Sequence, residues 1–297
     1  MLFPQILTLA FVTAIFPVAI ALQLPDYRAL KTSLNSTVLE VTFHNPDAPV
    51  VNLWSQDTQD ELTDLVERLQ SDNETKVVIF KSDVPRFFIA HLDLEILAGP
   101  NTNFIYTFAT LLYNITTLRQ VTIGAVEGRA RGAGSELLSA LDMRFATRTD
   151  TLIAQPELGV GLIPGGGGSQ FLTNLIGRGR AMEYILAAKD ITASEAEKIG
   201  WVNKAFETSA DMYAYVDQLT SRLRLFPLTA LHEAKKSINR ISAPTFEDIY
   251  AEAVAFSKQV ADPLTQQAMQ RSAAVFGNMS LLEAELNLSD WAPAFYQ

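Results

Sequence analysis

One segment constrains the fold more than any other: an apolar run that enters a glycine-containing loop and continues as a helix. The run, residues 121–126, is rich in small and β-branched apolar residues and predicts a buried strand. Gly128 interrupts the run, and apolar residues resume at helical spacing from Leu137. A helix that starts here has unpaired N–H groups and partial positive charge at its first turn. The segment therefore predicts a strand–loop–helix unit that can stabilise a developing oxyanion.

Two glutamates lie beside glycine-rich backbone in this part of the chain. Glu136 falls in the first turn of the expected helix, and Glu157 lies in the segment 155–168, which ends in four glycines. Two carboxylates that face one apolar pocket hold their pKa values apart, which suits acid and base work near neutral pH. Alternatively, the glycines serve tight packing and each glutamate caps a helix. The first interpretation predicts enolate stabilisation with proton transfer.

Strand and helix patterns alternate through the first two thirds of the chain. We expect strands at 38–42, 77–80, 121–126 and 143–146. The clearest helix is expected at 58–70, where one apolar face contains Leu62, Leu65, Val66 and Leu69. Strand signals vanish after about residue 211, and helices are expected at 212–223, 229–238, 246–260 and 264–276. The pattern predicts an α/β core with parallel strands over residues 22–210, and a helical region over residues 211–297.

Composition excludes several classes of function. The formal net charge of −10 and the pI near 4.8 argue against a nucleic-acid partner, which draws on a basic face. The chain has no cysteine, so it contains neither a disulfide nor a thiolate metal site. Its three histidines, His44, His91 and His232, lack ligand spacing, and we expect no metal site.

The amino-terminal sequence predicts the cellular location of the protein. Residues 6–22 form a nearly uninterrupted apolar run that is similar to the hydrophobic region and cleavage site of a secretory signal peptide. Five Asn-x-Ser/Thr sequons point the same way: Asn35, Asn73, Asn114, Asn278 and Asn287. We therefore expect residues 1–21 to be a signal peptide and the protein to enter the secretory pathway or the extracellular space. No stable membrane span is expected after cleavage.

Five motifs in their order along the chain resemble the crotonase superfamily, whose best-known members are enoyl-CoA hydratases and isomerases. These motifs are FIAHLDL (88–94), GAVEGRARGAGSEL (124–137), DMRFA (142–146), QPELGVGLIPGGGGSQFL (155–172) and AKDITASEAEKIGWVNKAF (188–206). With the flanking helices the resemblance covers roughly residues 35–240. It implies an α/β fold, a spiral of strand-strand-helix turns with a C-terminal helical region that packs in homotrimers or hexamers.

The resemblance also implies an enzyme and assigns its residues. The N–H groups of Leu92 and Ala133 would form the oxyanion hole for a thioester carbonyl, and Glu136 and Glu157 would be the acid and base. Arg86 matches a basic position that contacts the phosphates of coenzyme A. The remaining substrate-binding positions that the resemblance implies are Ala90, His91 and Gly132. Acyl-CoA would be the substrate, with coenzyme A as part of it and no separate cofactor.

This chain departs from the family pattern at several positions. His91 and Leu92 stand where many hydratases have Gly and Ala, and Ala133 stands where they have Gly. We expect His91 to be packed against the loop with its polar atoms satisfied, although it could also be a third polar group of the site. Arg129 and Arg131 either bind a substrate carboxylate or, as we expect, pair with Glu127 and other surface acids.

Several functions remain open. Hydration of a 2-enoyl-CoA or a double-bond shift is expected first, and thioester hydrolysis, decarboxylation or ring opening uses the same oxyanion hole. A secreted glycoprotein that uses the fold for binding alone is a different class of alternative. Secretion of the protein conflicts with an acyl-CoA substrate, because acyl-CoA is a metabolite of the cytosol, mitochondria and peroxisomes. Either the substrate is not a CoA thioester, or the protein is mitochondrial or peroxisomal as the family suggests.

Overall fold

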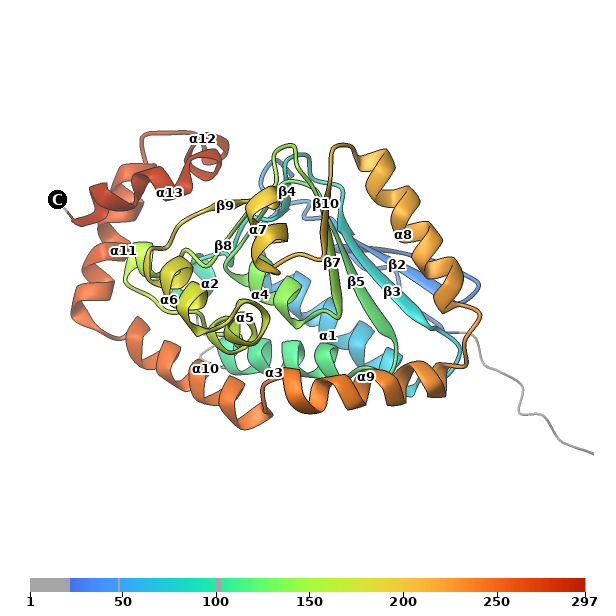
Figure 1. Ribbon diagram of the computed structural model, residues 1–297. Coiled ribbons are helices and arrows are strands. Elements are labelled where there is room, and N and C mark those ends of the chain that lie inside the picture. The colour runs from blue at the N-terminus through green and yellow to red at the C-terminus, as the bar shows by residue number, and fades with distance from the viewer. Residues whose placement is uncertain (1–21, 48, 100–102, 297) are drawn as a thin grey trace, which may run out of the picture.

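The computed structural model describes residues 22–47, 49–99 and 103–296, so the expected signal peptide, residues 1–21, lies outside the described residues. Two sheets are surrounded by helices, and the last helices of the chain, from residue 263 onward, lie away from the larger sheet (Figure 1). The larger sheet has the order β1-β2-β3-β5-β7-β10. Its strands are β1 (Leu30–Asn35), β2 (Val38–Phe43), β3 (Val77–Ser82), β5 (Val121–Val126), β7 (Met143–Thr147) and β10 (Lys204–Phe206). All neighbours pair in parallel except β1 and β2, which form an antiparallel pair.

A smaller sheet of short strands lies beside the larger one. It has the order β4 (Phe87–Ile89), β6 (Arg129–Arg131), β8 (Leu152–Ala154) and β9 (Ile191–Thr192). The consecutive pairs β3/β4, β5/β6 and β7/β8 each place one strand in each sheet, and a helix follows each pair. The chain therefore forms a spiral of strand-strand-helix turns, which confirms the fold that the resemblance implied.

Helices cover both faces of the larger sheet. On one face lie α1 (Gln56–Ser71), α3 (Phe104–Thr117) and α4 (Ala133–Ala140), and their apolar side chains form the main core with β2 and β3. The expected apolar face of α1 is confirmed, because its four leucine and valine residues are buried. On the other face, Met212 and Val216 of α8 (Ser209–Leu223) pack against Phe145 and Ile123. The expected strands at 38–42, 77–80, 121–126 and 143–146 correspond to β2, β3, β5 and β7.

The remaining helices fall into two groups along the sequence. The first group precedes the C-terminal region: α2 (Glu95–Ala98), the 3-10 turn η1 (Glu157–Val160), α5 (Gly168–Ile176), α6 (Arg178–Leu186) and α7 (Ala193–Ile199). The C-terminal region contains α9 (Leu228–Ser242), α10 (Phe246–Val260), α11 (Pro263–Phe276), α12 (Leu281–Leu286), α13 (Leu288–Trp291) and η2 (Ala292–Tyr296). Pro263 is at the first position of α11, after the capping side chain of Asp262, which accepts from Leu264 and Thr265.

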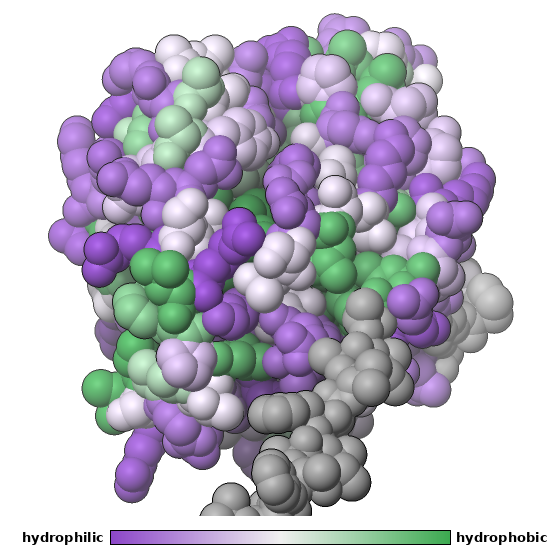
Figure 2. Space-filling model, turned by 90° about the vertical axis from the view of Figure 1, so that its right-hand side faces the viewer, coloured by the Kyte–Doolittle hydropathy of each residue, from purple (hydrophilic) through white to green (hydrophobic). Residues whose placement is uncertain are grey.

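The face of the molecule shown in Figure 2 is mainly hydrophilic, with a few small apolar patches. Some exposed apolar surface is ordinary for a folded protein. Within the described ranges, we find no helix that is both long enough and apolar enough to cross a bilayer.

Candidate active site

The site is assembled where three neighbouring strands of the smaller sheet end. Strands β4, β6 and β8 are parallel, with Phe87 opposite Arg129 and Ala130 opposite Ile153. Their carboxyl ends therefore meet at one edge of the sheet. Leu92 follows β4, α4 begins after β6 at Ala133, and η1 begins after β8 at Glu157. This topology brings together residues that are far apart in the sequence.

The N–H groups of Leu92 and Ala133 are both available to a ligand. His91 accepts from the N–H of Trp54 at 2.8 Å, and Asp93 donates to the carbonyl of Trp54 at 3.0 Å. In such a parallel bridge the N–H of the intervening Leu92 points to the opposite side. Ala133 is the first residue of α4, where helical N–H groups lack an intrahelical partner. Within the described ranges, neither amide donates a hydrogen bond to another protein group.

Glycines allow the start of α4 to approach β4 and Glu157. Gly132, the residue before the helix, has φ 47° and ψ −120°, a conformation that L-residues rarely adopt. A methyl group on Gly132 would lie 3.1 Å from Oε1 of Glu157, so this carboxylate is adjacent to the helix start. A methyl group on Gly134 would lie 2.5 Å from the carbonyl oxygen of Ile89. The helix therefore packs directly on β4, close to Leu92.

Glu136 is held by the glycine-rich loop that precedes α5. Its Oε1 accepts hydrogen bonds from the N–H groups of Gly165 at 3.1 Å, Gly166 at 2.7 Å and Gly168 at 3.1 Å. The residue is 3% exposed, and burial raises its pKa to about 7, although the three N–H donors oppose this rise. The loop therefore fixes one carboxyl oxygen while the pKa stays close to neutral pH.

Glu157 has a different environment. The atom Oε2 is buried and, within the described chain, has no hydrogen-bond partner. Burial, and then the nearby charge of Glu136, raise the pKa of Glu157 well above its usual range. Because the two groups are coupled, the pair keeps a proton near neutral pH. The expected arrangement of two carboxylates with separate environments is thus present in the geometry.

A third buried acid, Glu252 of α10, lies behind this pair and was not expected from the sequence. Its Oε1 accepts from the N–H of Ser169 at 3.1 Å, next to the amides that hold Glu136. Burial and the charge of Glu136 raise the pKa of Glu252 to about 8. The sequence contained a signal, because Glu252 falls on the buried face of α10 between Ile249 and Phe256.

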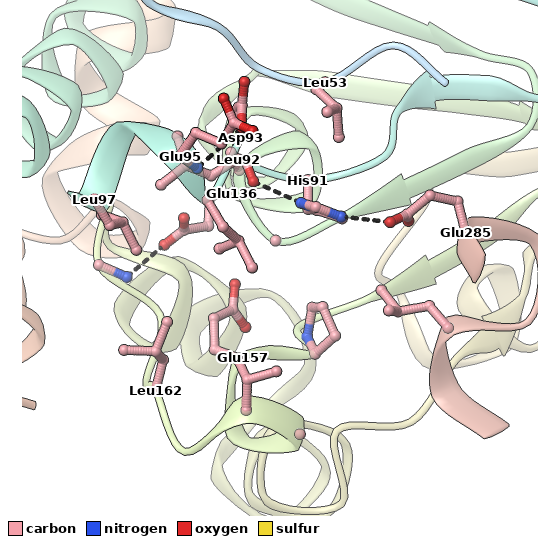
Figure 3. A pocket seen from close by; sticks show the side chains of 18 of the residues that line it. Leu53, His91, Leu92, Asp93, Glu95, Leu97, Glu136, Glu157, Leu162 and Glu285 are labelled. Atoms are coloured by element: carbon pink, nitrogen blue, oxygen red, sulfur yellow. Dashed lines mark hydrogen bonds and ion pairs between the residues drawn. The ribbon is translucent and has the colours of Figure 1, made fainter. Parts of the chain in front are cut away.

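These groups open into one cavity of about 580 Å³ (Figure 3). His91, Leu92, Gly132, Ala133, Glu136 and Glu157 all line it. Much of the remaining wall is apolar, from Leu53, Leu97, Ile105, Phe108, Leu162, Phe256, Phe276, Leu281 and Phe295. The C-terminal segment 281–295 therefore closes one side of the cavity, which is large enough for a small organic molecule.

The other two expected substrate-binding residues do not line this cavity. Ala90 is fully buried, and its N–H donates to the carbonyl of Asn52 at 2.9 Å. Arg86 lies in a separate depression and pairs with Asp150 at 3.4 Å. Its backbone has φ 69° and lies directly against Gly128. The placement of Arg86 therefore gives no support to the expected contact with coenzyme A phosphates, which stays a prediction.

Glu285 of α12 joins the C-terminal segment to the two loops that contain Leu92 and Ala133. The Nε2 atom of His91 lies 2.8 Å from Oε1 of Glu285, and Nδ1 lies 2.6 Å from the carbonyl oxygen of Leu92. Arg131 donates to the carbonyl oxygen of Glu285 at 2.7 Å. His91 is therefore satisfied by partners, as expected, and also lines the cavity. The sequence gave no signal for Glu285.

The two loop arginines have partners other than those expected. Arg131 is fully buried and makes two hydrogen bonds of 2.7 Å to Asp190, instead of pairing with Glu127 at the surface. Such a fork geometry fixes both the guanidinium and the carboxylate. Arg129 donates to the carbonyl oxygens of Asp150 and Leu286. In the described part of the chain, no cluster of three His, Asp or Glu side chains is suited to a metal ion.

Comparisons with known proteins agree with this architecture. A sequence model of the enoyl-CoA hydratase/isomerase family matches residues 33–276. The chain belongs to the enoyl-CoA hydratase/isomerase family. Among relatives of the family, the short-chain-enoyl-CoA hydratase of Clostridium acetobutylicum is 31% identical over 218 residues, which is 70% of this chain and 82% of the relative. The mitochondrial methylglutaconyl-CoA hydratase of Mus musculus is 31% identical over 196 residues, 64% of this chain and 62% of the relative.

Solved structures of the family share the fold. A provisionally named enoyl-CoA hydratase from Streptomyces avermitilis is 36% identical, with a TM-score of 0.83 over 91% of this chain and 98% of that chain. An enoyl-CoA hydratase from Geobacillus kaustophilus is 26% identical, with a TM-score of 0.69 over 86% of this chain and 96% of that chain. The fold and family are therefore those that the five motifs predicted.

Proposed function

We propose that this protein stabilises the enolate of an acyl thioester, and that it adds water across a 2-enoyl double bond or shifts that bond. The observation that supports this most is the meeting of two available amides and two buried carboxylates in one apolar cavity. All four come from the segments that follow three adjacent strands, β4, β6 and β8. A binding module has no need for carboxylates whose pKa values are raised toward neutral pH.

The amides of Leu92 and Ala133 would bind the thioester carbonyl oxygen. When water attacks C3 of the unsaturated thioester, electron density moves onto this oxygen. Each well-placed donor contributes about 3 to 4 kcal/mol to the stability of such a transition state. Because the donors belong to a strand end and a helix start, they need little reorganisation during the reaction.

Glu136 and Glu157 would move the protons. Their coupled titration leaves one proton on the pair near neutral pH, so the site contains both a base and an acid. The base takes a proton from the attacking water, and the acid gives its proton to C2. In a double-bond shift, the same groups would move a proton between two carbons. Coenzyme A as the carrier, with no separate cofactor, is what the family implies.

Hydration of crotonyl thioesters tests this proposal. Protein lacking residues 1–21 is expected to add water to the double bond, measured by loss of the enoyl-thioester absorbance and by product analysis. Glu136→Gln and Glu157→Gln should each lower kcat at least about a hundredfold, because each removes a proton-transfer group. The control is Glu67→Gln, an exposed residue of α1. Wild-type rates in both site variants would contradict the assigned roles.

We also propose that the protein passes through the secretory pathway. The apolar amino terminus and the sequons support this. Asn35, Asn73, Asn278 and Asn287 are exposed, whereas Asn114 is half-buried within α3. Four of the five sequons are thus accessible to a glycosyltransferase on the folded surface.

A further inference from the structure

The side chain of His91 meets a hydrogen-bond acceptor at each of its two ring nitrogens. Nδ1 lies 2.6 Å from the carbonyl oxygen of Leu92, and Nε2 lies 2.8 Å from Oε1 of Glu285 (Figure 3). A peptide carbonyl can only accept, as can an ionised carboxylate, and a neutral imidazole carries a single N–H. Both contacts are therefore hydrogen bonds to an ionised Glu285 only if the ring carries two protons.

The surroundings favour this ion pair over a neutral pair in which Glu285 keeps the proton. Glu285 is 3% exposed, and burial disfavours both charges. The carboxylate nevertheless raises the pKa of His91, and the imidazolium lowers the pKa of Glu285. The fully buried Arg131 lowers the pKa of Glu285 further. The proton therefore belongs on the ring.

Charged groups from several segments lie around the ring. They are Glu285 of α12, Arg131 of β6, Glu157 of η1, Asp190 before β9, and Asp93 of the loop itself. Arg131 acts against the proton on His91, but it makes two hydrogen bonds of 2.7 Å to Asp190. A methyl group on Gly132 would lie 3.1 Å from Oε1 of Glu157 and 3.5 Å from Cβ of His91, so these two residues flank one glycine. The two cations are thus matched by two paired carboxylates.

The ring acts on the peptide that follows the available amide of Leu92. In the peptide between Leu92 and Asp93, the carbonyl oxygen accepts from the ring at 2.6 Å, and the N–H donates to the carbonyl oxygen of Trp54 at 3.0 Å. In the preceding peptide, the carbonyl oxygen of His91 accepts from the N–H of Trp54 at 2.8 Å. The N–H of this preceding peptide is the one available to a ligand. Because both peptides that flank Leu92 are held, the direction of that N–H is fixed.

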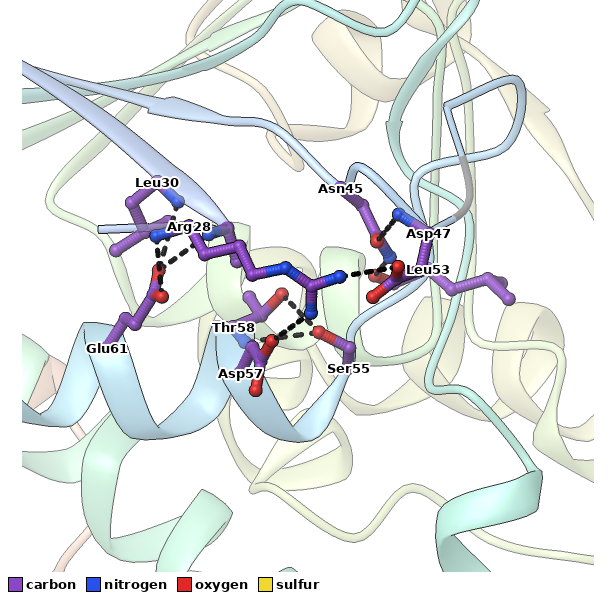
Figure 4. A network of polar contacts seen from close by, with 10 residues as sticks. Arg28, Leu30, Asn45, Asp47, Leu53, Ser55, Asp57, Thr58 and Glu61 are labelled. Atoms are coloured by element: carbon purple, nitrogen blue, oxygen red, sulfur yellow. Dashed lines mark hydrogen bonds and ion pairs between the residues drawn. The ribbon is translucent and has the colours of Figure 1, made fainter. Parts of the chain in front are cut away.

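The opposite edge of this bridge, residues 53–55, is held by other contacts. Asn45 donates to the carbonyl oxygen of Leu53 at 2.9 Å, and the side chain of Ser55 caps the first turn of α1 (Figure 4). Trp54, which lies between them, is fully buried. This edge is therefore fixed without the ring of His91, and the ring orders the loop on the other side.

We propose that His91 is a positioning residue of the proposed oxyanion hole: as an imidazolium held by Glu285, it directs the amide of Leu92 toward the thioester carbonyl oxygen. This inference rests on the proposed function, since the amide acts in the same reaction. Glu285 belongs to α12, so the C-terminal segment takes part in setting the amide that would bind the oxyanion.

Nuclear magnetic resonance of the histidine rings tests the charge. The sequence contains three histidines, so protein labelled with 15N in these rings gives three sets of signals. His44→Gln and His232→Gln assign two sets by their loss, and the third set belongs to His91. Near neutral pH we expect both ring nitrogens of His91 to be protonated in the wild type, and this form to be lost at lower pH in Glu285→Gln. A bare ring nitrogen on His91 in the wild type would overturn the proposal.

The carbonyl stretch of a bound thioester tests the positioning. Butyryl-CoA labelled with 13C at its carbonyl has no double bond to hydrate, and its carbonyl frequency falls when hydrogen-bond donors polarise it. We expect His91→Gln and Glu285→Gln to reduce the shift on binding to about half of the wild-type shift or less. His44→Gln is the matched control, because His44 pairs with Asp83 at 2.9 Å outside the cavity lining, and it should keep the full shift.

Turnover of crotonyl-CoA gives an independent readout. His91→Gln should lower kcat about tenfold and change KM less than about twofold, because an oxyanion donor acts chiefly in the transition state. The protonated ring is the active form, so part of the fall in wild-type kcat at high pH comes from its deprotonation. This part should be absent from His91→Gln and present in His44→Gln. If His91→Gln does not fold, Glu285→Gln, with this part displaced to lower pH, decides the same point.

Failure of the proposed function would look different. If the wild type neither hydrates crotonyl-CoA nor binds butyryl-CoA, the proposed chemistry is wrong and the positioning role is wrong with it. If the wild type reacts and both site variants keep its carbonyl shift and pH profile, the chemistry stands and the positioning role alone is overturned.

Discussion

At the scale of single residues, the buried acid Glu136 couples activity to stability. The pKa of its carboxyl is about 7 in the folded protein and 4.5 in the unfolded chain, so the folded state holds the proton more tightly. Stability is then lost as pH rises from about 4.5 to about 7, because ionisation is harder in the folded state. The shift corresponds to about 3 kcal/mol.

Glu136→Gln should therefore stabilise the protein while it lowers kcat. The amide oxygen can still accept from the three loop N–H groups, and it does not ionise. Urea unfolding should show a gain over wild type at pH 8 that is small at pH 4.5. Glu67→Gln, which is exposed, should show no such pH dependence. Equal stability of wild type and Glu136→Gln at both pH values would contradict the burial argument.

Gly132 is the residue whose substitution should damage the proposed oxyanion hole most directly. Its φ of 47° with ψ of −120° strains any side chain, at about 1 to 3 kcal/mol. The new methyl group in Gly132→Ala would also lie 3.1 Å from Oε1 of Glu157, which must move. We expect a lower Tm and a lower kcat. In the control Gly179→Ala, within α6, the methyl group meets nothing within 4 Å, and both values should be kept.

At the scale of residues, the sequence indicated the two carboxylates that meet in the cavity, but it did not indicate the residues that support them. Glu136 and Glu157 were found because glycine-rich motifs flank them. The burial of Arg131 could not be foreseen, since its partner Asp190 lies 59 positions away and charged residues are usually exposed. The same holds for His91, whose partner Glu285 is 194 positions away.

At the scale of elements, α12 is expected to stabilise the oxyanion loops through Glu285. Glu285→Gln weakens the contact with His91, whose pKa the carboxylate raises. We expect kcat to fall about tenfold, with the upper end of the pH profile displaced to lower pH, because His91 loses its stabilising charge. Glu283→Gln, on the exposed side of the same helix, should retain the wild-type profile. A profile of Glu285→Gln identical to wild type would show that this ion pair does not affect the reaction.

The success of sequence reasoning also varied among elements. Strand β5 was predicted to the residue because six consecutive buried positions are small or apolar. Strands β4, β6 and β8 have three residues each, which is too short for a period to appear, and two arginines made β6 resemble a loop. The geometry of the site depends on these short strands. The sequence motifs therefore predicted which residues form the site, but not how the strands bring them together.

At the scale of the whole molecule, the prediction concerns the cellular location of the protein. We expect the native protein to shift in mass when treated with an endoglycosidase, with glycans at one or more of the exposed sequons Asn35, Asn73, Asn278 and Asn287. Site mapping by mass spectrometry should leave Asn114 unmodified, because it is half-buried in α3. Recovery of the unmodified protein from mitochondria or peroxisomes would contradict the secretory proposal.

The position of segment 281–295 in the cavity wall has a consequence for proteolysis. Glu136, Glu157 and the amides of Leu92 and Ala133 all precede this segment in the chain, yet the segment supplies one side of the chamber around them. A protein cut by a protease before α12 would have these groups exposed to bulk water. We therefore expect the proposed reaction to require an uncut C-terminal segment.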